Sequence, residues 1–227
     1  MQQVLQNISR DELDAIATAC ERKAARVSSL VADGPMDDEA ARALLVLMFG
    51  ARRKADAILA SLGEGGFGRA AAELINGGGS LPDRFDAFVG ALADHEAHAR
   101  DVAAELLHWS DPDRYWLWTK WMWDPRTETG SLRLVTMEEF DLYGSSPGDT
   151  YLKVGEAVAF VNETGRAVGF TDIGSGPFGI NVFLACTYGI YMYTVLRMRM
   201  TQEFNHVVPQ LPELARRLLG VYRLEAA

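Results

Sequence analysis

The chain has 227 residues, of which 48% are hydrophobic and 23% charged, a composition typical of folded globular proteins rather than disordered ones. Its net charge of −9 and its pI near 5.0 disfavour non-specific attraction to nucleic acid or to an anionic membrane. Cys20 and Cys186 lie far apart in apolar stretches, which predicts neither a disulfide framework nor a paired metal site. Because the first residues also lack the basic and apolar blocks of a signal peptide, we expect a soluble, cytoplasmic protein.

The first quarter of the chain predicts two long helices. Ser9 and Glu12 have the spacing of a capping box, in which each side chain bonds a free backbone N–H at the start of a helix. The apolar spacing continues this helix to about residue 31. A second apolar stripe predicts one helix over residues 37–62.

Glycines then form a GxGxxG pattern at Gly63, Gly65 and Gly68. The pattern resembles the glycine-rich loop of protein kinases, which needs flanking strands, a downstream lysine strand, a catalytic loop and a metal-binding DFG sequence. The chain offers none of these, and its flanks have a helical pattern. We therefore predict a loop between helices, followed by a short helix over residues 69–75.

The next predicted helix, over residues 82–109, carries a stripe of acidic residues and histidines. Carboxylates and imidazoles at helical spacing are a donor set that metals accept, and the weak candidates here are His98, Asp101, Glu105 and His108. The spacing lacks the paired Glu-x-x-His motifs of di-iron bundles. A polar stripe opposite an apolar one is also what any amphipathic helix shows, so we favour a solvated face and expect no cofactor.

All five tryptophans of the chain lie between residues 106 and 123. After the Asp111-Pro112 break we predict a short helix to about residue 122, apolar nearly all round. Such a helix must be buried on both sides. One side is expected to be core, and the other carries Trp116 and Trp123 with Lys120 between them.

This second side is either part of a large core or a partner surface, since large exposed apolar patches are uncommon in monomers. Tyr115 and Arg114 adjoin it and complete the predicted binding residues. Tyr115, Trp116 and Trp123 are also able to stack on a flat ligand or base.

The last part of the chain predicts one short strand and then helices. The strand is expected over residues 131–136, and helices follow at 137–140 and 150–161. A second GxGxxG pattern, at Gly174, Gly176 and Gly179, resembles the first motif of methyltransferases that use S-adenosylmethionine. Those enzymes continue with further βα units, which the remaining fifty or so residues do not predict.

Residues 173–196 contain no charged side chain, and a run of 18 or more such residues is long enough to consider a membrane span. Its Asn, Thr, Tyr and Gly content favours instead a central buried helix over about residues 179–202, and we expect no membrane. A final amphipathic helix is predicted to run to about residue 222.

Residues 80–190 resemble, through short motifs, the helical domains of helix-hairpin-helix DNA glycosylases. The matching positions are those of a leucine-leucine-histidine helix end followed by a proline turn and an aromatic segment: Leu106, Leu107, His108, Asp111, Pro112 and Tyr115. The resemblance implies a helical fold. The hairpin glycines are absent, and Thr119 stands near the position of the catalytic aspartate, so glycosylase activity is not implied.

We therefore predict a mostly α protein, a multi-helix orthogonal bundle with at most a small β element. It forms a single domain over residues 1–227, with a possible division into 1–79 and 80–227. The expected function is a non-catalytic binding or assembly protein whose aromatic helix meets a protein partner or a second copy. The alternatives are a nucleic-acid-associated helical domain, which the acidity disfavours, and a metal-dependent enzyme.

Overall fold

The computed structural model describes residues 8–32, 36–167, 176–199 and 209–222. Within these ranges the fold is mostly α, as predicted, and its one β feature is an isolated bridge between Asp124 and Thr129. The helices are α2 (Arg10–Ala32), α3 (Asp38–Leu47), α4 (Ala55–Leu62), α5 (Gly66–Asn76), α6 (Leu81–Ala91), α7 (Glu96–Ser110), α8 (Pro147–Ala167), α9 (Pro177–Arg199) and α10 (Leu211–Leu218), with 3-10 turns η1 (Ala93–His95) and η2 (Leu132–Leu134).

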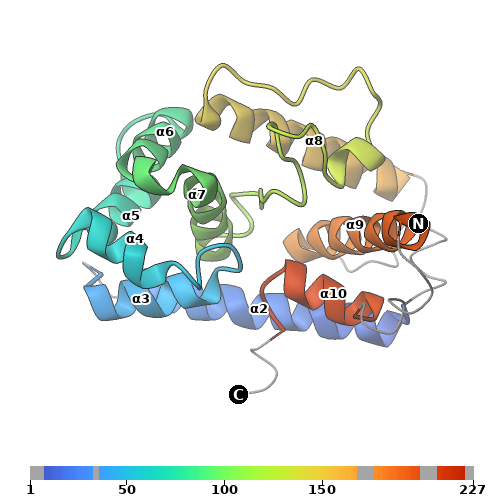
Figure 1. Cartoon of the computed structure of the whole chain (residues 1–227), viewed down its shortest axis with the longest axis horizontal. Helices are drawn as coiled ribbons and strands as arrows, with labels where there is room; N and C mark the ends of the chain where they lie inside the picture. The colour runs from blue at the N-terminus through green and yellow to red at the C-terminus, as the bar shows by residue number, and fades with distance from the viewer. Residues whose placement is uncertain (1–7, 33–35, 168–175, 200–208, 223–227) are drawn as a thin grey trace.

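Helix α2 underlies the molecule and spans its length, with α3 to α6 gathered over one end and α8 to α10 over the other (Figure 1). The predicted capping box is present: Ser9 N–H donates to Glu12 Oε2 at 2.9 Å, and Glu12 N–H donates to Ser9 Oγ at 3.2 Å. The buried side of α2 packs on α7, α9, α10 and α3. The buried hydrophobic side chains of the described residues join into one cluster, while the possible division near residue 79 stays a prediction.

The single helix predicted over residues 37–62 is wrong, because the chain turns between α3 and α4. Helix α3 ends at Leu47, and the backbone of the next residue, Met48, is extended (φ −87°, ψ 122°). Gly50 then lies against α7, where an added Cβ would stand 3.4 Å from Asp101 Oδ2. The turn also buries both Met48 and Ala51 completely, a gain that outweighs continued helix through a glycine.

The single helix predicted over residues 82–109 is likewise two helices. Ser80 caps α6 by accepting from Asp83 N–H. Helix α6 ends at Ala91, just before Leu92, whose side chain is buried in the core. Helix α6 packs on α5, α7 and α8. The change of direction at Leu92 lets α7 leave α6 and run along α2.

The aromatic segment does not form the predicted helix, since residues 111–131 are turns and extended chain. Two of its indole N–H groups bond backbone carbonyls instead: Trp118 donates to Trp123 at 2.9 Å and Trp121 donates to Leu218 at 3.1 Å. Buried indoles usually find such a partner, although Trp123 Nε1 has none among the described residues. The burial of these rings and their N–H groups outweighs a helix of only about ten residues, which is marginal by itself.

The strand predicted over residues 131–136 is also wrong. This segment forms η2 and a turn, in which Thr136 Oγ1 donates to the carbonyl of Leu132 at 2.8 Å. Residues 137–140 are turn and extended chain rather than helix. No β-strand neighbour lies beside either segment in the described chain, so nothing completes a sheet.

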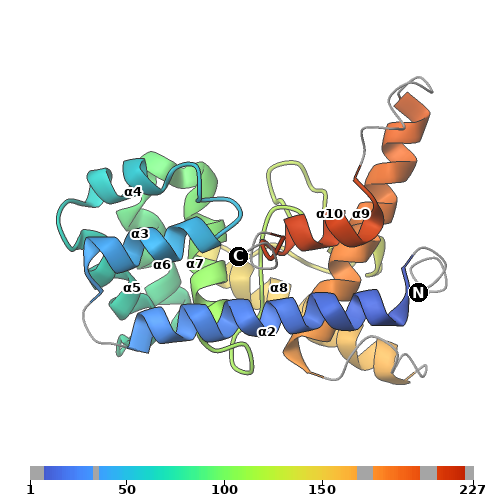
Figure 2. The same cartoon turned by 90° about the horizontal axis from the view of Figure 1, so that it is seen from below.

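Helix α9 begins near its predicted start, and its C-terminal half extends past the other helices (Figure 2). Its Pro177–Val195 part has 19 residues with a mean hydropathy of 1.3, enough to cross a membrane by length and composition alone, and 44% of it is buried inside the fold. Cys186 is fully buried whereas Tyr191 is 36% exposed. The first half of α9 therefore belongs to the core. The helix packs against α2 and α10, with Gly189 facing Leu211 and Leu214 of α10.

The described glycines of the two patterns lie at the starts of α5 and α9 or just before them. Gly63 and Gly65, with φ of 68° and 63°, form the loop between α4 and α5, as predicted. Gly176 and Gly179 lie at the start of α9, and Gly174 lies outside the described residues. The final helix ends at Leu218, four residues before the predicted end at Tyr222.

Candidate ligand-binding site

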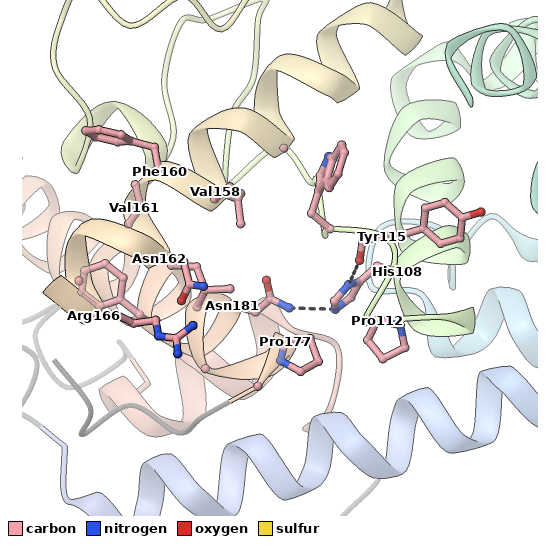
Figure 3. A pocket seen from close by; sticks show the side chains of 18 of the residues that line it. His108, Pro112, Tyr115, Val158, Phe160, Val161, Asn162, Arg166, Pro177 and Asn181 are labelled. Atoms are coloured by element: carbon pink, nitrogen blue, oxygen red, sulfur yellow. Dashed lines mark hydrogen bonds between the residues drawn. The ribbon is translucent and has the colours of Figure 1, made fainter. Parts of the chain in front are cut away.

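A pocket of about 670 Å³ opens between α8, the start of α9 and the chain that leaves α7 (Figure 3). Its volume lies within the range usual for small-molecule sites, roughly 300–1,000 Å³. Residues 112–116 form one wall, residues from Gly155 to Arg166 a second, and residues from Gly176 to Phe183 a third. Segments that are distant in the sequence therefore build it together.

The apolar part of the wall is held rigidly at Trp116. Its ring stacks on Tyr151 at a centroid distance of 4.9 Å, and its Nε1–H donates to the Tyr151 carbonyl at 2.8 Å. The ring also lies directly on Gly155, where an added Cβ would stand 2.1 Å from Trp116 Cε2. Val158, Ile180 and Phe183 continue this surface.

A chain of hydrogen bonds crosses one side of the pocket through His108. Its Nδ1 lies 2.7 Å from the carbonyl oxygen of Tyr115, and its Nε2 lies 2.8 Å from Asn181 Nδ2. Burial lowers the pKa of His108 to about 4, so the ring is neutral at pH 7 and carries one N–H. A carbonyl oxygen only accepts, so that N–H is at Nδ1.

The same hydrogen bonds fix the orientation of the Asn181 side-chain amide. Because His108 Nε2 is then an acceptor, Asn181 must turn its NH₂ group to the ring. The amide oxygen of Asn181 is left on the other side, and Figure 3 shows it directed toward the pocket. Asn181 is only 1% exposed, so the pocket contains a fixed acceptor on a buried residue.

The charges at the pocket are mostly positive although the whole chain is acidic. Arg114 and Arg166 line it, and Asp113 is the one carboxylate in the described lining. The first turn of α9, which carries the positive end of the helix dipole, contains no acidic residue. Arg114 lies over the Tyr115 ring at 5.2 Å, which holds the guanidinium at the rim.

The predicted binding residues are divided by the fold. Arg114, Tyr115 and Trp116 line the pocket. Trp123 is fully buried, with its ring centre 5.5 Å from that of Tyr143 and 4.8 Å from the Arg133 guanidinium. Of the two alternatives for this side, Trp123 therefore fits the core, and its predicted part in binding stays a prediction. Lys120 is partly buried, and whether the chain meets a protein partner stays a prediction.

The candidate metal ligands do not gather. Glu105 bonds Lys23 and the Trp109 indole, and His108 is used as described above. Burial raises the pKa of Asp101 to about 7 and lowers that of His98. Among the described residues, no three or more His, Cys, Asp or Glu side chains form a group able to hold a metal ion.

Two polar residues of the pocket, Asn181 and Arg166, were not predicted as site residues from the sequence. Asn181 gave a usable signal, since a buried amide in an apolar helix requires a partner, but nothing in the sequence identified His108 as that partner. Arg166 lies in the last turn of α8 and gives no local signal at all, because helix ends commonly carry a basic residue.

Comparisons with known proteins add no assignment. Neither protein-family models, nor curated protein sequences, nor solved structures give a match to this chain. The resemblance to helix-hairpin-helix glycosylases therefore stays a prediction.

Proposed function

We propose that this chain is a non-catalytic binding protein that takes a small, partly apolar molecule into the pocket between α8 and α9. The observation that carries the proposal is the fixed acceptor of Asn181 beside the rigid Trp116 wall. A largely apolar pocket with few, well-placed polar groups is the usual form of a ligand site. The sequence predicted binding through a surface of an aromatic helix. We propose instead that the aromatic segment binds through this pocket, which Trp116 lines.

The side chains support binding rather than catalysis. General acid–base catalysis needs a group that exchanges a proton near the working pH. His108 has both ring nitrogens in hydrogen bonds and a pKa lowered to about 4. The described lining holds no Ser, Cys, Lys or Glu, and Asp113 lies exposed at the rim.

The test is a fluorescence titration with prodan, a neutral naphthalene dye whose emission shifts to shorter wavelengths in an apolar site. We expect saturable binding of one dye per chain, and loss of that binding in Val158→Trp, because Val158 points into the pocket (Figure 3). Glu163→Trp, on the same helix and outside the lining, is the matched control and should bind as the wild type does.

Circular dichroism shows whether each variant folds, and Ala159→Trp replaces Val158→Trp if the latter does not. Ala159 is an exposed residue of the pocket wall, so its replacement leaves the core intact. No saturable binding to the wild type, or equal binding to the wild type and both filled-pocket variants, contradicts the proposal.

A further inference from the structure

We infer that the natural ligand of this pocket is an amphipathic anion: an apolar body that carries a carboxylate or a similar acidic group together with an N–H or O–H donor. The inference rests on the proposed function and adds the chemical class of the ligand. It is carried by the polarity of the His108–Asn181 chain and by the positive charges of the lining.

The requirement for a donor follows from Tyr115. Its carbonyl oxygen fixes the proton of His108 on Nδ1, which makes Nε2 an acceptor, which in turn presents the Asn181 oxygen to the pocket. A ligand that covers this oxygen without donating to it leaves a buried acceptor unsatisfied, at a substantial cost. A hydroxyl, amide or ring N–H at this point avoids that cost.

The requirement for an anion follows from three positive contributions around one opening. Arg166 and Arg114 lie at the rim, on different elements, and the first turn of α9 lines the pocket between Gly176 and Ile180. Within the described residues no ion pair engages either guanidinium. Figure 3 shows the Arg166 side chain directed along the pocket. Guanidinium groups suit carboxylates because they donate in a planar fork.

The apolar body follows from the wall itself. Trp116 lines the pocket with a ring that Gly155 and Tyr151 hold in place, and Val158 and Phe183 lie in the same lining. A flat apolar group placed there gains contact with an indole that loses little conformational freedom. The three features together define one molecule with separate apolar, donating and anionic parts.

The experiment compares three matched probes by competition with prodan. Indole-3-propionate has all three features, 3-(indol-3-yl)propan-1-ol lacks the charge, and 1-methylindole-3-propionate lacks the ring donor. We expect indole-3-propionate to bind at least tenfold more tightly than the alcohol and about fivefold more tightly than the methylated acid. Losses of this size correspond to one hydrogen bond to a charged or neutral group.

The variant Arg166→Gln should reduce the preference for the acid over the alcohol to less than threefold. Arg126→Gln removes the same charge from an exposed turn outside the lining and should leave the preference unchanged. Both positions are exposed, so neither substitution should affect folding. Binding of the uncharged alcohol shows whether a variant has altered the pocket in any other way.

The outcomes separate the two proposals. If prodan binds and the acid and alcohol compete equally, the inferred ligand class is wrong while the proposed function stands. The same holds if Arg126→Gln lowers the preference as much as Arg166→Gln does. If prodan itself shows no saturable binding, the proposed function is wrong, and the inferred ligand class is wrong with it.

Discussion

Lys23 Nζ lies 3.0 Å from Glu105 Oε2 in the interior, with side-chain exposures of 0% and 4%. Lys23 also donates to the carbonyl of Leu219 at 3.0 Å and lies 4.3 Å from the centre of the Trp109 ring. The Trp109 indole donates to the same Glu105 oxygen at 3.2 Å. This cluster joins α2, α7 and the residue after α10. His108, which lines the pocket, lies on α7 next to Trp109.

Removing one member of this ion pair should destabilise the protein strongly. Lys23→Met leaves the Glu105 carboxylate buried without its cation, and such losses cost about 3–5 kcal/mol of unfolding free energy. The double variant Lys23→Met with Glu105→Leu removes both charges and should recover most of that loss. Urea denaturation followed by circular dichroism measures all three proteins.

The exposed pair Arg42–Asp56 is the control for this prediction. Its side chains are 57% and 76% exposed, and surface pairs contribute little to stability. Arg42→Met should therefore leave the urea midpoint close to that of the wild type. A double variant as unstable as Lys23→Met alone would show that packing, and not the unpaired charge, determines the loss.

The buried His108 should make the protein less stable in mild acid. The unfolded chain takes up a proton on this histidine near pH 6.5, whereas the folded protein does so only near pH 4. Stability from the neutral ring is complete above pH 6.5 and is lost as the pH falls toward 4, by about 3 kcal/mol. His108→Gln keeps a donor for Tyr115 and an acceptor for Asn181 and should lose this pH dependence. Urea midpoints between pH 4 and 7.5 measure it, and equal slopes in both proteins would contradict the assignment.

The buried Asp101 should make the protein less stable as the pH rises, which is opposite to the effect of His108. Burial raises its pKa to about 7 from an ordinary value of 3.8, so the folded protein holds this proton where the unfolded chain has released it. The resulting stability is complete below pH 3.8 and is lost as the pH rises through about 7. Asp101→Asn should therefore have a higher thermal midpoint than the wild type at pH 8, with a gap that closes toward pH 4. Asp94→Asn, at an exposed position of the 3-10 turn before α7, should show no such gap.

Gly155 should be essential for the position of Trp116. A methyl group there would stand 2.1 Å from the indole, and the ring is held by its bond to Tyr151. Gly155→Ala is therefore expected to cost about 1–3 kcal/mol, as overpacking does, and to weaken prodan binding. Gly90→Ala lies in helix α6 with nothing within 4 Å of the added Cβ and should be neutral or slightly stabilising. Equal stability of the two variants would show that the Trp116 ring moves aside at little cost, and would contradict this prediction.

Local signals in the sequence predicted the helices well where the deciding contacts are also local. The Ser9–Glu12 cap lies within three residues, and the loop after α4 needs only its glycines. The breaks at Met48 and Leu92 depend instead on distant partners, such as the approach of Asp101 to Gly50. Periodicity alone does not contain that information.

The aromatic segment shows the same limit at larger scale. Its composition predicted that one side is core, which the burial of Trp118 and Trp121 confirms, but the partners of its indoles, Leu218 and Tyr151, lie in remote parts of the chain. Three residues of the pocket wall were predicted as binding residues because they belong to the aromatic segment: Arg114, Tyr115 and Trp116. Its polar half, Asn181 and Arg166, comes from helices that only the fold brings to His108.

The central claim is that a small molecule binds beside Trp116, and the side-chain N–H signals of the five tryptophans test it most directly. In a ¹H–¹⁵N correlation spectrum of the protein titrated with prodan, each indole should give its own signal. We predict saturable shifts of the Trp116 signal and of the Asn181 amide, with Trp118 and Trp123 unchanged because their rings lie in the core away from the lining. A Trp116 signal that does not move at saturating dye, or shifts centred on Trp123, would contradict the account.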